Sequence, residues 1–224
     1  STDKIDSICY EFINDNDAYS APLFYRGFPK SCCTSANHIV CHGIPGEKIL
    51  YEGDIVNIDV TAYKDGWHGD TSRMFYVGDV SVKAKKLVEN TYRAMMEAIK
   101  ILNKDICLGD IGATIQNYVE KNGFSVVRDF CGHGIGKKFH QEPNILHYGK
   151  KGEGKKLKAG MIFTIEPMIN EGKYETKLLN DGWTAVTKDK KLSAQFEHTV
   201  GITNDGYEIF TLSKKGLNFP PYKS

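Results

Sequence analysis

The sequence has no long hydrophobic run. No stretch approaches the roughly 18 consecutive apolar residues that a membrane-spanning helix requires, and residues 1–12, STDKIDSICYEF, have neither the basic start nor the apolar stretch of a signal peptide. The sequence also has almost no excess of charge, because 29 Lys and Arg oppose 28 Asp and Glu. We therefore expect no membrane association and no specific nucleic-acid partner.

Closely spaced cysteine pairs of the redox or zinc-binding kind are also absent. The six cysteines include no CxxC pair, and the sequence has no Asn-x-Ser/Thr sequon. This pattern differs from a secreted disulfide framework and is typical of a protein whose thiols stay reduced. We expect a cytoplasmic protein; because the sequence begins at Ser1 without a methionine, an organellar form that has lost a targeting segment is the alternative.

No linker divides the chain. Its 224 residues, of which 41% are hydrophobic and 25% charged, are sufficient for one buried core. We expect a single domain over residues 1–224, without a zinc-binding N-terminal extension. The one charge run, residues 149–158, contains five Lys and one Glu and is predicted to be a solvated loop, with binding to ribosomal RNA as the alternative.

The spacing of apolar residues predicts three helices. The first covers residues 2–14, and Ser81 is expected to cap a second that extends to Leu102. Asp110 is expected to cap the third, which ends at Gly123. Strands are predicted around an Asp65-Gly66 turn and in the last third of the chain, at residues 49–51, 55–60, 74–77, 124–130, 160–169, 183–187 and 194–202. Strands, then helices, then more strands indicate an α+β fold.

Two of these strands have the same pattern. Residues 53–59, GDIVNID, and residues 160–166, GMIFTIE, both follow Gly-x-Ile-apolar-polar-Ile-acid, and another acid, Asp70 or Glu197, lies on a later strand. The pattern favours two related halves that face each other and bring four carboxylates together. The alternative is that two buried strands resemble each other by composition alone.

The acids in these strands are unexpected, because Asp59 and Glu166 interrupt segments that should lie in the core. A buried carboxylate needs a cation or hydrogen-bond donors. Asp59 and Asp70 should share one face of the predicted hairpin, where a divalent cation would relieve their repulsion. His133, between the glycines of CGHGIG, offers a nitrogen ligand. Each residue alone is more often structural, but together they predict a site for two divalent ions that activates water for hydrolysis.

Nine segments of the chain together resemble the type I methionine aminopeptidases. They occur in the family's order and spacing between about Leu23 and Thr203, at residues 25–31 (YRGFPKS), 41–46 (CHGIPG), 57–61 (NIDVT), 69–72 (GDTS), 131–136 (CGHGIG), 139–143 (FHQEP), 164–168 (TIEPM), 181–184 (DGWT) and 195–199 (QFEHT). The resemblance implies a pita-bread fold of two pseudo-symmetric halves, with an antiparallel sheet and helices packed on its outer face. Residues 140–166 leave no room for the helical insertion of the type II enzymes.

The resemblance also implies the ligands of two divalent metal ions, with Asp70 and Glu197 bridging: Asp59, Asp70, His133, Glu166 and Glu197. Cobalt, manganese, iron and zinc all suit such a site, and the sequence does not choose among them. By the same resemblance, His140 donates to the scissile carbonyl oxygen, and His42 lies beside the leaving amine. Glu166 would also accept a proton from the bridging water.

A pocket for the methionine side chain is implied as well. It should be apolar and polarizable, because a thioether packs favourably against aromatic edges. The residues that match the family's pocket, beside the substrate contacts His42 and His140, are Tyr25, Phe28, Cys33, Phe139 and Trp183. Phe24 and Arg26 depart from the pattern, because bacterial members commonly have Gly and His there. Phe28 replaces a frequent Tyr.

The implied activity is removal of the initiator methionine from nascent proteins and peptides with a small second residue, through attack of a metal-bound hydroxide on the first peptide bond. The expected partners are nascent N-termini, with transient ribosome association also considered, and the protein is expected to be a monomer. Two alternatives are a proline-specific peptidase of the same fold and a non-catalytic module that binds RNA through residues 149–158. Cleavage of Xaa-Pro peptides without Met-Ala activity would identify the first.

Overall fold

The centre of the molecule is an antiparallel hairpin of two long strands, β4 (Ile55–Lys64) and β5 (Trp67–Tyr76). The computed structural model describes residues 1–222. The hairpin turns at Asp65 and Gly66, whose φ angles of 51° and 87° suit a two-residue primed turn. Asp70 pairs with Thr61, two positions along β4 from Asp59. The two acids therefore share one face of the hairpin, as predicted.

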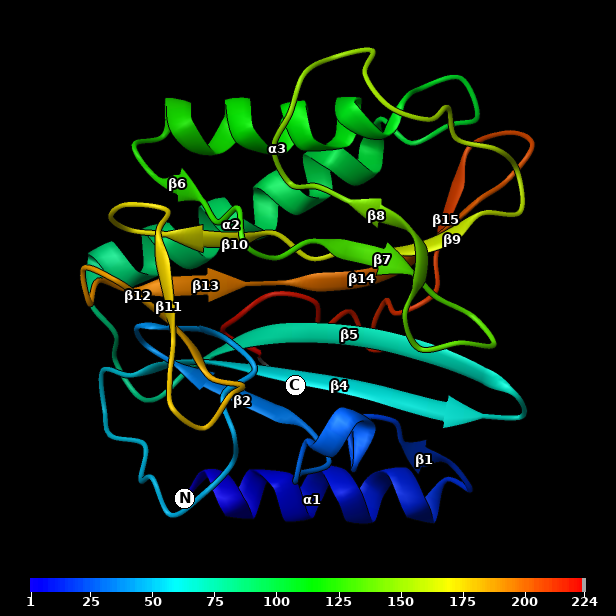
Figure 1. The fold of residues 1–224 in the computed structure, drawn as a ribbon. Helices are drawn as coiled ribbons and strands as arrows, with labels where there is room; N and C mark the ends of the chain where they lie inside the picture. The colour runs from blue at the N-terminus through cyan, green and yellow to red at the C-terminus, as the bar shows by residue number, and fades with distance from the viewer. Residues whose placement is uncertain (223–224) are drawn as a thin grey trace.

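A nine-stranded antiparallel sheet extends from this hairpin. Its other strands are β1 (Tyr19–Ser20), β2 (Cys33–Ala36), β7 (Gly132–Gly134), β8 (Gln141–Ile145), β9 (Ile162–Ile165), β14 (Glu197–Ile202) and β15 (Tyr207–Ile209). They follow the order β1-β4-β5-β14-β9-β7-β8, with β2 beside β4 and β15 beside β14 (Figure 1). Because β5 pairs with β14, strands from the first and second halves of the sequence meet in the middle of the sheet.

Two three-stranded sheets complete the β-structure. One has the order β13 (Ser193–Gln195), β10 (Met168–Asn170), β6 (Ser125–Val126), and the other β11 (Thr176–Leu178), β12 (Ala185–Thr187), β3 (Ile39–Cys41). The predicted strands near residues 124–130, 160–169, 183–187 and 194–202 are therefore present, although most are shorter than the pattern suggested.

In the described part of the chain, three α-helices lie outside the large sheet. They are α1 (Thr2–Asp15), α2 (Val82–Lys100) and α3 (Leu108–Lys121). Helix α1 packs against β1 and β2, whereas α2 and α3 pack together on the opposite side of the molecule, against β13, β10, β6 and β8 (Figure 1). The apolar faces of α2 and α3 form the main core with buried residues such as Phe163 and Phe196. This arrangement confirms the predicted α+β class with outer helices.

Two local predictions are wrong. Residues 49–51 form no strand: Ile49 and Tyr51 are exposed, and the Tyr51 N–H donates to the Asp54 carboxylate in a local turn. Asp110 is not the N-cap of α3 but its third residue, where its side chain accepts from the N–H of the true cap, Cys107. An acid three residues into a helix satisfies a free N–H as a cap does, which makes the two positions easy to confuse.

Other local predictions are confirmed. The Ser81 side chain caps α2 by accepting from the Ala84 N–H at 3.1 Å. Residues 149–158 are a loop whose backbone carbonyls at Glu153 and Lys155 accept from the first N–H groups of α3. None of the helices within residues 1–222 is both long and apolar enough to cross a bilayer.

Candidate active site

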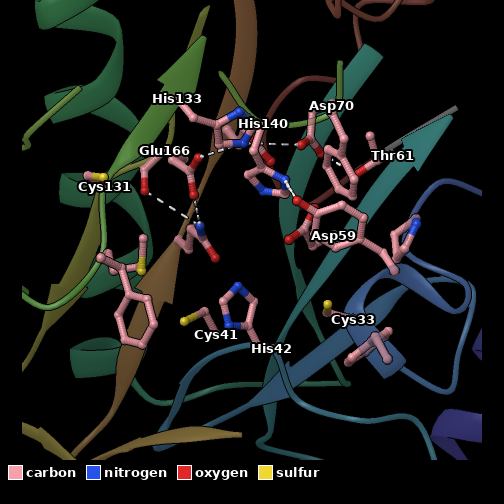
Figure 2. Close-up of a pocket in the computed structure, with 18 of the residues that line it drawn as sticks. Cys33, Cys41, His42, Asp59, Thr61, Asp70, Cys131, His133, His140 and Glu166 are labelled. Atoms are coloured by element: carbon pink, nitrogen blue, oxygen red, sulfur yellow. Dashed lines mark hydrogen bonds and ion pairs between the residues drawn. The ribbon is translucent and has the colours of Figure 1, made fainter. Parts of the chain in front are cut away.

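All twelve residues predicted for the site line one cavity of about 490 Å³. The cavity opens beside the junction of β5 and β14. Figure 2 shows His133, Glu166, Asp70, Asp59 and His140 around one end of it, with His42, Cys33 and Cys41 farther along its wall. Residues that are distant in the sequence are thus brought together as the sequence analysis expected.

Carboxylates converge on the His133 imidazole. Its Nε2 atom lies 3.6 Å from Asp70 Oδ2 and 3.6 Å from Glu166 Oε1. Asp70, His133 and Glu197 each offer a ligand atom within 4.8 Å of the others, and all three are buried. Asp59 lies two positions along β4 from Thr61, the partner of Asp70, and lines the same cavity as these three residues.

Close backbone packing brings His133 to this position. A Cβ on Gly132 would lie 2.4 Å from the Thr164 carbonyl oxygen, and one on Gly134 would lie 2.3 Å from that of Glu142. Only glycine therefore lets β7 approach both of its neighbouring segments this closely. The glycines on either side of His133 therefore allow the close backbone approach that places its imidazole at the site.

The carboxylates have strongly perturbed acidity. Burial raises the pKa of Asp59 to about 7 and that of Glu166 to about 8. Burial, followed by the charges of neighbouring carboxylates, also raises the pKa of Asp70 and of Glu197. Four neighbouring acids with raised pKa values would ionise more readily beside a bound cation.

The donor set fits divalent metal ions. Within residues 1–222, no lysine or arginine forms an ion pair with any of the four carboxylates. The basic group that does contact two of them is His133, and burial lowers its pKa. Carboxylate oxygens with one imidazole are the ligands that divalent cations such as manganese, cobalt, iron and zinc accept. The side chains thus form a potential metal centre whose charge is otherwise unbalanced.

We expect the metal-free protein to lose stability as the pH rises through neutrality. Unfolded Asp and Glu release their protons near about pH 4, whereas folded Asp59 keeps its proton to about pH 7 and Glu166 to about pH 8. Because the folded state binds more protons in this window, the contribution of these groups to the free energy of unfolding is complete below about pH 4. It is lost as the pH rises to about 8, by up to about 1.4 kcal/mol per pH unit for each proton.

Urea denaturation with a chelator measures this effect, with Glu166→Gln as the matched variant that cannot titrate at this position. Buried histidines act in the opposite direction, since burial lowers the pKa of His147 to about 3 and that of His198 to about 4. The contribution of these histidines to the free energy of unfolding is lost as the pH falls below about 6.5. It is the same in the wild type and in Glu166→Gln. The wild type should lose stability relative to Glu166→Gln between about pH 5 and 8. Parallel curves would contradict the prediction.

His140 lies at the cavity mouth, next to the metal-binding candidates. Its Nδ1 atom is 3.0 Å from the Tyr25 hydroxyl, and its ring centroid is 4.1 Å from that of His133. Burial, with the nearby charges of His133 and Arg26, lowers the pKa of His140, so the ring is neutral near pH 7. When the Tyr25 hydroxyl donates to Nδ1, the ring proton lies on Nε2.

His42 occupies the far wall of the cavity. Its φ of 55° places it in the left-handed region, which is costly for a residue with a side chain and tends to occur at functional sites. The ring packs edge-on against Phe130 and Trp183, with centroid distances of 5.5 and 6.2 Å. Burial lowers its pKa, which also favours a neutral ring.

Aromatic side chains form the apolar part of the cavity. Tyr25 contacts Phe139 at 4.8 Å between centroids, and Phe28 packs edge-on against Trp183 at 5.2 Å. Cys33 pairs in β2 opposite Asp59, so its side chain joins this wall to the carboxylates. An aromatic slot with a thiol beside it suits a flexible, polarizable side chain.

The pocket loop contains two further left-handed residues, Phe24 at φ 65° and Arg26 at φ 49°. Glycine, which the family resemblance led us to expect at the first position, adopts this conformation without penalty. The departure noted at Phe24 therefore places a strained residue at the rim, with its ring exposed.

Several polar residues around the acids were missed in the sequence analysis. Thr61 Oγ1 donates to Asp70 at 2.7 Å, and Thr164 Oγ1 donates to Glu166 at 2.8 Å. Gln195 Nε2 donates to Glu166 Oε2 at 3.3 Å. The signal was available, because each lies two positions before or after an acid in the sequence, a spacing that puts two side chains on the same face of an extended chain.

His147 was also missed, and no local pattern indicates it. It is fully buried, and its Nε2 atom accepts the Glu166 N–H at 3.1 Å. Glu166 is therefore held through its backbone as well as through its side chain. This contact joins residues that are 19 positions apart and depends on the assembled sheet.

Comparisons with known proteins agree with this geometry. The model of metallopeptidase family M24 matches residues 1–204. The methionine aminopeptidase of Rickettsia prowazekii is 60% identical over 223 residues, covering 99% of this chain and 86% of the relative. The methionine aminopeptidase of Escherichia coli K12 is 53% identical over 216 residues, covering 96% of this chain and 82% of the relative.

Solved structures agree as well. The crystal structure of the Rickettsia prowazekii methionine aminopeptidase superposes with a TM-score of 0.94, covering 95% of this chain and 86% of that one. The crystal structure of the Thermotoga maritima methionine aminopeptidase is 40% identical in sequence and superposes with a TM-score of 0.93. That match covers 94% of this chain and 85% of the Thermotoga chain. The cavity thus lies in a fold that this chain shares over at least 94% of its length with these two structures.

Proposed function

Because the chain belongs to metallopeptidase family M24 and, within it, to the methionine aminopeptidases, we propose that its cavity removes the N-terminal methionine from peptides and nascent proteins whose second residue is small. The chain has the pita-bread fold of these relatives. The observation that carries the proposal is the position of four carboxylates and one imidazole at the end of an aromatic pocket.

Two divalent ions would be held by Asp59, Asp70, His133, Glu166 and Glu197, in a centre of the type I kind. Two such ions balance four carboxylates in charge, which supports a pair rather than one ion. When bound, they supply Lewis acidity and lower the pKa of a coordinated water. Thr61 holds the Asp70 carboxylate in place, and Thr164 and Gln195 hold that of Glu166, which would fix these oxygens for metal binding.

The remaining roles fall to residues around this centre. His140 donates from Nε2 to the scissile carbonyl oxygen, where negative charge develops during attack. Glu166 accepts the proton of the attacking water. His42, on the opposite wall, lies beside the leaving amine, and its packing against Phe130 and Trp183 limits the space for the second residue.

Methionine selection follows from the shape and chemistry of the pocket. Tyr25, Phe28, Phe139 and Trp183 enclose the side chain, and Cys33 lies at its polarizable end. A charged side chain would leave a buried group without a partner, which is costly. The whole chain, built as two halves that meet at β5 and β14, would form this one catalytic domain.

Peptide hydrolysis on a Met-Xaa-Ser series tests the proposal. After removal of metal with a chelator and reloading with manganese or cobalt, turnover should return for Met-Ala-Ser and stay at least about tenfold lower for Met-Leu-Ser, because added methylenes at a confined site cost about 1 to 3 kcal/mol. An Ala-Pro peptide should not be cleaved. Cleavage of Xaa-Pro peptides without release of methionine would instead identify a proline-specific enzyme.

A further inference from the structure

Strand β14 changes partners at Thr199. It pairs with β5 through Glu197 and His198, and with β15 through residues 200–202. Strand β9 pairs along the opposite edge of β14, so β5 and β15 share one edge. In the antiparallel register of β5 and β14, the next residue of β14, Thr199, would face Asp70.

The main-chain groups of Thr199 are used by the segment after β15 instead. The Thr199 N–H donates to Thr211 Oγ1 at 3.2 Å, and the Thr199 carbonyl accepts the Phe210 N–H at 3.0 Å. The Thr199 hydroxyl accepts the Asp70 N–H at 3.0 Å and donates to the Asp70 carbonyl at 2.8 Å. One hydroxyl thus takes the place of a strand partner and satisfies both main-chain groups of Asp70.

The position of Asp70 depends on this contact because both residues are buried. Asp70 is 4% exposed and Thr199 is 2% exposed. A buried N–H or C=O without a partner is costly, so loss of the hydroxyl should shift the main chain at Asp70 toward other partners. The Asp70 carboxylate, which accepts from Thr61 Oγ1 at 2.7 Å, would move with it (Figure 2).

We propose that Thr199 is a positioning residue that holds the main chain of Asp70 so that its carboxylate meets a divalent metal ion. The proposal rests on the proposed metal centre, in which Asp70 is a ligand. Thr61 holds the carboxylate, and Thr199 holds the peptide groups on either side of the same Cα atom. Loss of a hydrogen-bond partner that orients a metal ligand typically lowers metal affinity by about 10- to 100-fold.

Calorimetric titration of the metal-free full chain with manganese tests this role. Thr199→Val keeps the shape of the side chain without the hydroxyl and is expected to weaken manganese binding by about tenfold or more. Thr199→Ser keeps the hydroxyl and should bind manganese within about threefold of the wild type. Thr91→Val is the control: it removes a buried hydroxyl that donates to the Leu87 carbonyl within α2, and manganese affinity should not change.

The outcomes separate positioning from stability. If Thr199→Val were less stable in urea but bound manganese as tightly as the wild type, the hydroxyl would be merely structural, and the proposal would be overturned. Equal losses of affinity in Thr199→Val and Thr199→Ser would overturn it as well, because the hydroxyl would not be the cause.

Two further measurements keep the test decisive. If Thr199→Val does not fold, Thr199→Cys replaces it, because a thiol is a weak donor and acceptor. Its manganese affinity should lie below those of the wild type and Thr199→Ser, and wild-type affinity would overturn the proposal. A wild-type protein that binds no manganese would instead overturn the proposed metal centre. The titration does not depend on turnover, so the two failures are distinguishable.

Discussion

Replacing Asp59 with asparagine is expected to reduce turnover of Met-Ala-Ser by at least about 10³-fold, equivalent to about 4 kcal/mol of transition-state stabilisation. The amide has the shape of the carboxylate but not its charge, so one metal position loses an anionic ligand. Calorimetric titration with manganese should show weaker or incomplete binding. Glu197→Gln should have the same effect, because it removes a charge that both metal positions would share.

Protein stability provides the control for this result. Because burial raises the pKa of Asp59 to about 7, the carboxylate is costly in the metal-free protein, and Asp59→Asn should be at least as stable as the wild type in urea with a chelator. Asp65→Asn, at the exposed turn of the same hairpin, should retain full activity. Wild-type rates from metal-loaded Asp59→Asn would count against the proposed centre.

Removal of the His140 imidazole gives the second large effect. His140→Ala should lower kcat and kcat/KM together by about 10² to 10³, as expected when a donor to a developing oxyanion is lost. Metal content should not change, because His140 is not among the proposed ligands. An unchanged kcat would exclude this role.

A milder variant tests how His140 is oriented. Tyr25→Phe removes the hydroxyl that lies 3.0 Å from Nδ1 and should lower kcat by about tenfold, in the range for loss of an orienting partner. The aromatic contact between positions 25 and 139 would remain. If Tyr25→Phe reduced kcat as strongly as His140→Ala, the hydroxyl itself would be the donor.

The central hairpin could be predicted because its signals are local. Alternating side chains on either side of Asp65-Gly66 determine the turn and the register, and the register places Asp59 and Asp70 on one face. The same reasoning gave a false strand at residues 49–51, because their apolar side chains resemble a strand although the Asp54 carboxylate fixes a turn there. Short strands such as β7 and β2 have too few residues for a periodic pattern.

The site residues also differ in how far the sequence alone could reveal them. Its acids could be identified because charge inside an apolar strand is anomalous wherever the strand lies. His147 could not, since a single histidine in a loop-rich segment shows nothing until β8 and β9 bring it behind Glu166. The aromatic pocket was predictable only through family resemblance, because Tyr25 and Trp183 lie in separate segments that no local pattern connects.

The order of strands in the large sheet has a consequence for biosynthesis. Strand β14, which carries Glu197, lies between β5 and β9 although it is synthesised after both of them. Until it is inserted, the two flanking strands have no partner on the sides that face each other, and the acid cluster lacks a member. A newly made molecule can therefore complete its acid cluster only after residues 197–202 have left the ribosome.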